Sequence, residues 1–209
     1  MEFEQTVAND LLKIKAVTLR PDHPFTWASG IKAPIYTDNR LTISYPDVRR
    51  HIYQGMSDLI RRFYGEATVI AGTATAGIPH AAWVAEELGL PMIYVRSKPK
   101  DHGQGRQIEG VLAPDAKVVV IDDLLSTGGS VLNAVKAVQQ EGAEVLGVVA
   151  DFSYQLPALD ENFVAANLTY HTVTNYSALI EVAEENNLVM VDQKESLHAW
   201  RKDPANWQA

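Results

Sequence analysis

The sequence predicts an α/β protein built on a doubly wound parallel sheet, and its 209 residues fit one domain, 1–209. Short runs that are apolar throughout predict strands buried on both faces, because half-exposed strands alternate apolar and polar residues. Segments with helical apolar spacing separate these runs, as is typical of parallel sheets with helices on both faces. The predicted strands are 69–72, 92–95, 118–121, 145–150 and 188–191, and the helices between them are 78–88, 131–140 and 177–185.

The N-terminal third predicts two helices on either side of an irregular β element. Apolar residues recur at helical intervals over residues 3–14, and residues 45–64 return to that pattern with Pro46 at a first-turn position. Residues 20–40 contain three prolines and a Ser-Gly pair, which favour short strands and turns. We expect residues 20–40, with the C-terminal segment 193–207, to form a hood beside the sheet.

The composition excludes several function classes. With 18 basic and 26 acidic residues the formal charge is −8, which argues against broad nucleic-acid binding and against a polybasic membrane anchor. No apolar run approaches the roughly 18 residues of a membrane span. The chain has no cysteine, so disulfides, thiolate metal sites and cysteine nucleophiles are excluded. The absence fits a cytoplasmic chain better than a small secreted one.

Segment 118–130 reads Val-Val-Val-Ile-Asp-Asp-Leu-Leu-Ser-Thr-Gly-Gly-Ser, and it is the most informative part of the chain. It begins as a predicted strand, and ligands of doubly wound sheets bind beyond the carboxyl ends of strands. Glycines and hydroxyls before a helix N-terminus form a cradle for phosphate. The carboxylates of Asp122 and Asp123 would repel a phosphate unless they face sugar hydroxyls or a divalent metal. The segment therefore indicates a phosphorylated sugar, the plainer alternative being a strand–turn–helix connection with an Asp cap.

Segment 96–106 carries four basic residues and one acid, a local charge of +3 in an acidic protein. Pro99, Gly103 and Gly105 disfavour regular structure, and His102 can carry a proton near neutral pH. A basic loop after a strand is suited to closing over a polyanion. The alternative is a solvated surface loop.

Four segments together resemble the orotate phosphoribosyltransferase family, a group of type I phosphoribosyltransferases, in its Gram-positive form. Segment 118–130 is similar to the signature for 5-phosphoribosyl 1-pyrophosphate (PRPP), and Lys-Pro-Lys-Asp-His-Gly at 98–103 is similar to the mobile catalytic loop. Residues 25–36 resemble the N-terminal hood motif. Residues 72–79, Gly-Thr-Ala-Thr-Ala-Gly-Ile-Pro, resemble the pyrophosphate loop.

The resemblance implies transfer of the phosphoribosyl group from PRPP to orotate, giving orotidine 5′-monophosphate and pyrophosphate in pyrimidine (UMP) biosynthesis. It implies Mg²⁺, held through PRPP and waters near Asp122 and Asp123, and a homodimer in which loop 96–106 acts across the interface. The implied catalytic residues are Arg96, Lys100, His102 and Asp123. PRPP binding is implied for Arg96, Lys100, His102, Asp122, Asp123, Leu124, Leu125, Ser126, Thr127, Gly128, Gly129 and Ser130.

Orotate binding is implied for Ser126, with Tyr36 and Lys32 on the hood. The chain departs here from the sequence pattern of the enteric bacterial members of the family. Two lysines of that pattern are replaced by Ala28 and Ala76, and an arginine that contacts orotate is replaced by Tyr154. Lys32 and Arg40 are hypotheses for the cation that replaces them.

Two alternatives stay open. A purine or xanthine phosphoribosyltransferase would use the same phosphate cradle, although the hood motif argues against it. A PRPP-sensing regulator would keep the cradle and lose catalysis, although the loop lysines and His102 are retained and no basic surface is indicated.

Overall fold

The computed structural model describes residues 3–27, 30–98 and 107–208. Within these ranges six strands form the central sheet, in the order β10-β9-β8-β5-β6-β7. Neighbouring strands are parallel except that the edge strand β7 runs antiparallel to β6. This confirms the predicted doubly wound α/β fold. The strands are β5 (Val69–Thr73), β6 (Met92–Val95), β7 (Ile108–Glu109), β8 (Lys117–Leu125), β9 (Glu144–Ser153) and β10 (Tyr170–Asn175).

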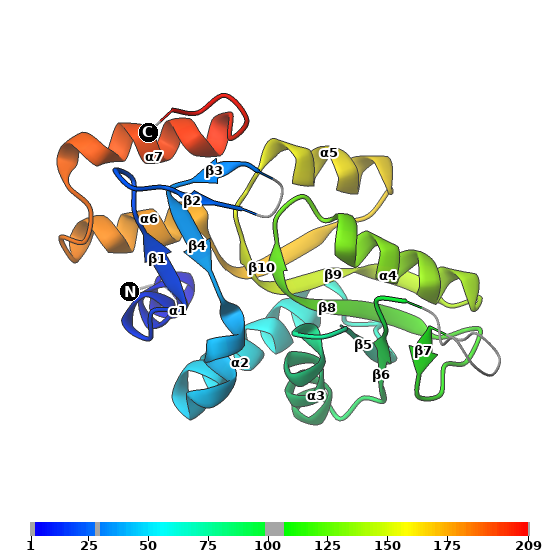
Figure 1. Ribbon diagram of the computed structural model, residues 1–209. Helices are drawn as coiled ribbons and strands as arrows, with labels where there is room; N and C mark the ends of the chain where they lie inside the picture. The colour runs from blue at the N-terminus through cyan, green and yellow to red at the C-terminus, as the bar shows by residue number, and fades with distance from the viewer. Residues whose placement is uncertain (1–2, 28–29, 99–106, 209) are drawn as a thin grey trace.

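Helices cover both faces of the sheet (Figure 1). On one face lie α1 (Phe3–Lys13), α2 (Pro46–Phe63), α3 (Gly77–Leu88) and α6 (Tyr176–Glu185). On the other lie α4 (Gly129–Gln140) and α5 (Pro157–Ala165). Each face buries its own apolar cluster, which is why the central strands are apolar on both sides.

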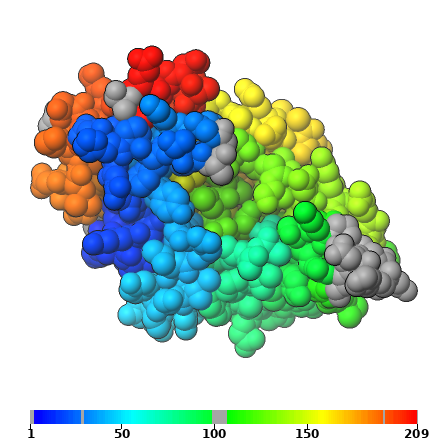
Figure 2. Space-filling model, viewed as in Figure 1, coloured from blue at the N-terminus to red at the C-terminus, as the bar shows by residue number. Residues whose placement is uncertain are grey.

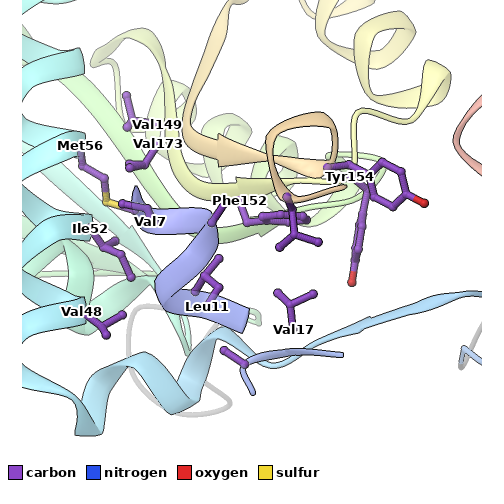
Figure 3. Close-up of a cluster of buried hydrophobic side chains, with 14 of the residues drawn as sticks. Val7, Leu11, Val17, Val48, Ile52, Met56, Val149, Phe152, Tyr154 and Val173 are labelled. Carbon is purple, nitrogen blue, oxygen red and sulfur yellow. The ribbon is translucent and has the colours of Figure 1, made fainter. Parts of the chain in front are cut away.

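The larger cluster joins the first two helices to the sheet (Figure 3). Leu11 of α1 and Ile52 and Met56 of α2 are fully buried there, together with Val149 of β9. Burying an aliphatic side chain stabilises a fold by about 1.5–3 kcal/mol. This packing fixes α1 and α2, which precede and follow the hood in the chain, against the sheet.

Residues 17–27 and 30–37 form the predicted irregular β element. In it β1 (Val17–Leu19) pairs antiparallel with β4 (Ile35–Thr37), and β2 (Phe25–Thr26) pairs antiparallel with β3 (Lys32–Ala33). A 3₁₀ helix, η1 (Asn39–Ser44), leads from it into α2. The C-terminal helix α7 (Val191–Lys202) packs on this hood through Trp200. That side chain is fully buried, and its Nε1 donates to the Lys32 carbonyl at 3.0 Å.

The structure corrects two element predictions. The predicted strand 188–191 is wrong, because α6 ends in a reversal in which Asn187 has φ 55° and Leu188 N donates to Ala183 O. The edge of the sheet is instead β10, which the sequence analysis did not predict, and α5 was not predicted either. Strand β8 also continues past Ile121 to Leu125, so the paired acids lie within a strand.

Across the described ranges, none of the helices has both the length and the apolar character to span a membrane.

His80 of α3 is a histidine that the fold keeps neutral. Its side chain is fully buried against Trp83, and neither ring nitrogen has a hydrogen-bond partner among the described residues. Burial lowers the pKa of His80 to about 4. Below pH 6.5, the unfolded-state pKa, the unfolded chain therefore binds a proton at this histidine and the folded chain does not. The free energy of unfolding falls as the pH is lowered from 6.5 to about 4.

We predict that His80→Leu is stabilised relative to the parent chain by about 2 kcal/mol more at pH 5 than at pH 8. The measurement is urea unfolding at the two pH values. The exposed His23 supplies the control, since His23→Leu should change stability equally at both. If His80→Leu changed the free energy of unfolding equally at pH 5 and pH 8, His80 would not be held neutral by the fold.

Candidate active site

Two adjacent carboxyl groups stand near the carboxyl end of β8. Asp122 is 8% exposed, and its Oδ1 accepts hydrogen bonds from Thr73 Oγ1 at 2.6 Å and from the Asp123 backbone N–H at 3.0 Å. Thr73 ends the neighbouring strand β5 and is itself buried. Asp123 is half-buried. The parallel register therefore brings a hydroxyl from β5 against the first acid of β8.

Burial dominates the protonation of both acids. It raises the pKa of Asp122 to about 7, with a further rise from the charge of Asp123, while the Thr73 hydroxyl opposes the rise. Burial also raises the pKa of Asp123. Near neutral pH, Asp122 is thus poised between a proton-bearing and a charged form, and both forms bind hydroxyl groups.

A third carboxyl group, Asp151 on β9, lies fully buried close to these two. The register pairs Asp122 with Ala150 and Leu124 with Phe152, which places Asp151 opposite Asp123. Neither carboxyl oxygen of Asp151 has a hydrogen-bond partner among the described residues. Burial, and then the charge of Asp123, raises the pKa of Asp151 well above its ordinary value, so it is held neutral.

The residues after the acids form a tight loop before α4. Gly128 has φ +78°, and a Cβ there would come within 2.8 Å of Phe163, so glycine is required for both conformation and space. Asn162 of α5 donates to the Thr127 carbonyl at 2.9 Å and holds the loop. Among the described residues no side chain caps the start of α4, so its first N–H groups are open to an anion. Ser126 is half-buried, and Thr127, Gly129 and Ser130 are exposed.

The predicted pyrophosphate loop and basic loop meet this cradle. A small pocket is lined by Thr73, Ala74, Arg96 and Ser130, among others. Arg96 is about one-third exposed and pairs with Glu109 at 3.8 Å, and its backbone N–H donates to the Gln107 carbonyl at 2.9 Å. Described residues from three predicted segments thus border one pocket: Thr73 and Ala74, Arg96 and Ser97, and Ser130. Lys100 and His102 lie outside the described residues.

The hood reaches the carboxylates through η1. Asn39 is buried, and its Nδ2 donates to the Asp123 carbonyl at 2.7 Å. The next residue, Arg40, binds Asp38 through Nε at 2.6 Å and Nη2 at 2.9 Å. Tyr36 of β4 is 45% exposed, and its ring lies 5.5 Å from that of Phe25. Figure 2 shows the surface recessed between the blue hood and the green segment that contains β8.

Of the hood residues predicted to bind orotate, Lys32 is the least connected to the site. It is exposed on β3 and makes no ion pair with a described residue. Tyr154, which stands where the enteric pattern has arginine, is 3% exposed. Its ring packs 4.9 Å from Trp27 and 5.5 Å from Phe152, so it serves the core under the hood (Figure 3 shows Tyr154 and Phe152).

Within the described part of the chain, no group of three or more His, Cys, Asp or Glu side chains could hold a metal ion. Mg²⁺ is commonly bound by one or two carboxylates together with substrate phosphates. Asp122 and Asp123, two neighbouring oxygen donors beside an anion cradle, fit that kind of site.

Comparison with known proteins agrees with this geometry. The phosphoribosyl transferase domain family matches residues 42–161. An orotate phosphoribosyltransferase from Lactiplantibacillus plantarum is 62% identical over 99% of this chain and 97% of its own length. The chain belongs to the orotate phosphoribosyltransferase family. The family resemblance found in the sequence is thereby confirmed.

Solved structures of orotate phosphoribosyltransferases share the fold. The enzyme from Aeropyrum pernix has a TM-score of 0.71 and 27% identity, covering 88% of this chain and 99% of its own. The enzyme from Mycobacterium tuberculosis, solved in complex with PRPP, has a TM-score of 0.67 and 26% identity, covering 85% and 99%.

Sequence reasoning missed several residues of this candidate site. Thr73 could have been found, because a hydroxyl at the end of a strand beside the acidic strand is within reach of its neighbour. Asn39 and Asp38 had no local signal, since their roles depend on how the hood folds back onto β8. Asp151 follows the predicted strand 145–150 and was not singled out in the sequence, and only the register shows its proximity to Asp123.

We predict that Thr73→Val raises the pKa of Asp122 further, because the hydroxyl that stabilises the carboxylate is lost. The measurement is a ¹³C NMR titration of the Asp122 carboxyl carbon. Thr73→Ser keeps the hydroxyl and should leave the titration in place. If valine and serine gave the same midpoint, the Thr73 contact would have no part in setting it.

Proposed function

We propose that this site performs the reaction for which its relatives are named, with PRPP bound across the β8–α4 loop. Transfer from PRPP to orotate gives orotidine 5′-monophosphate and pyrophosphate. The observation that carries the proposal is the single pocket bordered by Thr73, Arg96 and Ser130, next to Asp122 and Asp123. It joins an anion cradle to groups that bind hydroxyls, as a phosphorylated sugar requires.

In the proposed complex, the 5′-phosphate lies against residues 126–130, where Gly128 brings the backbone close and the start of α4 offers free N–H groups. Leu124 and Leu125 contribute backbone, since the Leu125 side chain belongs to the core. Asp122 and Asp123 bind the ribose hydroxyls. Ser126, at the start of the loop, faces the base.

The chemical step breaks the bond between C1′ and a pyrophosphate oxygen as N1 of orotate bonds to C1′, and the proton that N1 carried leaves with the pyrophosphate. Positive charge develops at C1′, and negative charge accumulates on the departing pyrophosphate. Arg96 and, from the family resemblance, Lys100 and His102 stabilise that charge, while Asp123 lies on the ribose side. Mg²⁺ arriving with PRPP would add to this stabilisation, with Asp122 and Asp123 as the carboxylates that fit it.

We further propose that the hood, residues 20–40 with the C-terminal segment, covers the base. Three observations support it: the bond from Asn39 to the Asp123 carbonyl, the bond from Trp200 to the Lys32 carbonyl, and the Trp27–Trp200 ring contact at 5.6 Å. Tyr36 and Lys32 then lie on the element that faces the base. The C-terminal helix thus acts as a support for the hood.

A homodimer and a cytoplasmic location complete the proposal. Leu41 and Tyr45, between the hood and α2, are exposed apolar side chains beside the site and suit a subunit interface. Across it, loop 96–106 of one subunit would reach the pyrophosphate in the other. A cytoplasmic location follows from the substrate, because a polyanionic sugar phosphate does not cross membranes.

We predict that purified protein with PRPP and Mg²⁺ consumes orotate, seen as a loss of its ultraviolet absorbance, and that Lys100→Ala lowers kcat at least about 100-fold with unchanged thermal stability. Lys136 on the exposed face of α4 gives the matched control, since Lys136→Ala should keep full activity. Turnover of hypoxanthine or xanthine in place of orotate would favour a purine enzyme. Binding of PRPP without turnover of any base would favour a regulator.

For the dimer, we predict that mixing inactive Lys100→Ala with inactive Asp123→Asn restores about a quarter of parental activity, because half the molecules are hybrids with one intact site. Mass spectrometry of the mixture establishes that subunits exchange. Two copies of Asp123→Asn carrying different tags form the control and stay inactive. Exchange without recovered activity would place loop and cradle of one site in the same subunit.

A further inference from the structure

Arg40 is a cation set at the edge of the carboxylate cluster. Its neighbour Asn39 is buried and bonded to the Asp123 carbonyl at 2.7 Å, which ties this turn to β8. Burial raises the pKa of Asp123, and the charge of Arg40 opposes that rise. Arg40 also lies within electrostatic reach of Tyr36. It therefore lies near both the exposed hood aromatic and the carboxyl group proposed to hold the ribose.

The Arg40 side chain is held in place and still accessible. Asp38 accepts from its Nε and Nη2, at 2.6 and 2.9 Å, while the Arg40 side chain stays 66% exposed. A guanidinium has five N–H donors, so those on Nη1 and the second on Nη2 are not used by Asp38. An anchored fork of this kind loses little entropy when it binds a second carboxylate.

The chemistry of orotate places a carboxylate at this position. Orotate carries its carboxylate on C6, next to N1, the atom that bonds to C1′ of the ribose. With the ribose hydroxyls at Asp122 and Asp123, as proposed above, the carboxylate lies within a few ångströms of the ribose and on the hood side. A site built for it needs a cation there, because an unpaired carboxylate in a partly buried site is costly.

Four other described cations are less suited than Arg40 to bind this carboxylate. Arg96 borders the pocket on the pyrophosphate side. Arg20 lies over the Phe25 ring at 5.0 Å, and Arg201 donates to Gln155 and Ser177. Lys32 makes no described contact with the carboxylate cluster. Tyr154 is buried and carries no charge.

We propose that Arg40, held by Asp38, binds the carboxylate of orotate and of its product and so selects a carboxylated pyrimidine. The inference rests on the proposed function, since it takes the ribose position from it. Asp38 is a positioning residue, and Arg40 is the group that touches the substrate.

The test compares two products that differ only in this carboxylate: orotidine 5′-monophosphate, which has it, and uridine 5′-monophosphate, which lacks it. Calorimetry gives the Kd of each for the parent chain and for Arg40→Ala. We expect the Kd of orotidine 5′-monophosphate to rise about 10- to 100-fold, as for a lost charge-assisted hydrogen bond, and that of uridine 5′-monophosphate to stay unchanged. Arg40→Lys keeps the charge and loses the fork, so it should lie between.

Arg61→Ala is the matched control, because Arg61 is also exposed, at 50%, and also pairs with a nearby acid, Asp58, at 2.9 Å. It should change neither Kd. Equal weakening of both nucleotides by Arg40→Ala, or no weakening of either, would overturn the assignment of Arg40.

The binding of PRPP separates this outcome from a failure of the proposed function. Arg40→Ala should bind PRPP with the affinity of the parent chain, whereas Asp123→Asn should bind it more weakly. If the parent chain bound neither PRPP nor orotidine 5′-monophosphate, the proposed function itself would fall.

Discussion

The structure depends on burying carboxyl groups side by side at one end of its sheet. Asp122, Asp123 and Asp151 lie on adjacent strands, and their charges would repel one another if all three were ionised. The fold avoids this by keeping Asp151 neutral, by giving Asp122 the Thr73 hydroxyl, and by setting Arg40 near Asp123. The repulsion that remains between the carboxyl groups favours ligands that bring hydroxyl groups or a divalent cation to them.

This arrangement explains why the hood and the sheet are joined where they are. Strand β8 continues through the acids to Leu125, so their backbone is fixed by pairing with β9 and not by a free loop. Asn39 then bonds to the Asp123 carbonyl, and Tyr154 N donates to the Leu125 carbonyl. The two contacts tie the hood and the aromatic cluster of Trp27, Tyr154 and Trp200 to the same strand. A shift of the hood would therefore move the groups around Asp123 as well.

Much of the site could be predicted because its signal is local. Segment 118–130 contains a strand, paired acids, glycines and the start of a helix, one after another in the chain. Each can be recognised from its own residues, by apolar character, by charge or by the backbone freedom of glycine. The contacts that complete the site are not local: Asn39 lies 84 residues from Asp123, and Thr73 lies 49 from Asp122. Strand β10 was missed because Tyr170–Asn175 is mostly polar and half-buried at a sheet edge. Residues 188–191 were predicted as a strand from their apolar character, but Leu188 belongs to the C-terminal turn of α6.

The sequence of charges across the site resolves how an acidic protein would bind a polyanion. Arg96 and the start of α4 attract anions on one side, the carboxyl groups occupy the middle, and Arg40 stands on the hood side. The product nucleotide, a ribose with a 5′-phosphate at one end and a carboxylated base at the other, carries the matching order of anion, hydroxyls and anion. In the proposed position each group meets its complement, and a shift of the ligand along the site would set an anion against Asp122 and Asp123. Under the proposed function, the carboxyl cluster that costs the fold electrostatic energy would thereby fix the position of the substrate along the site.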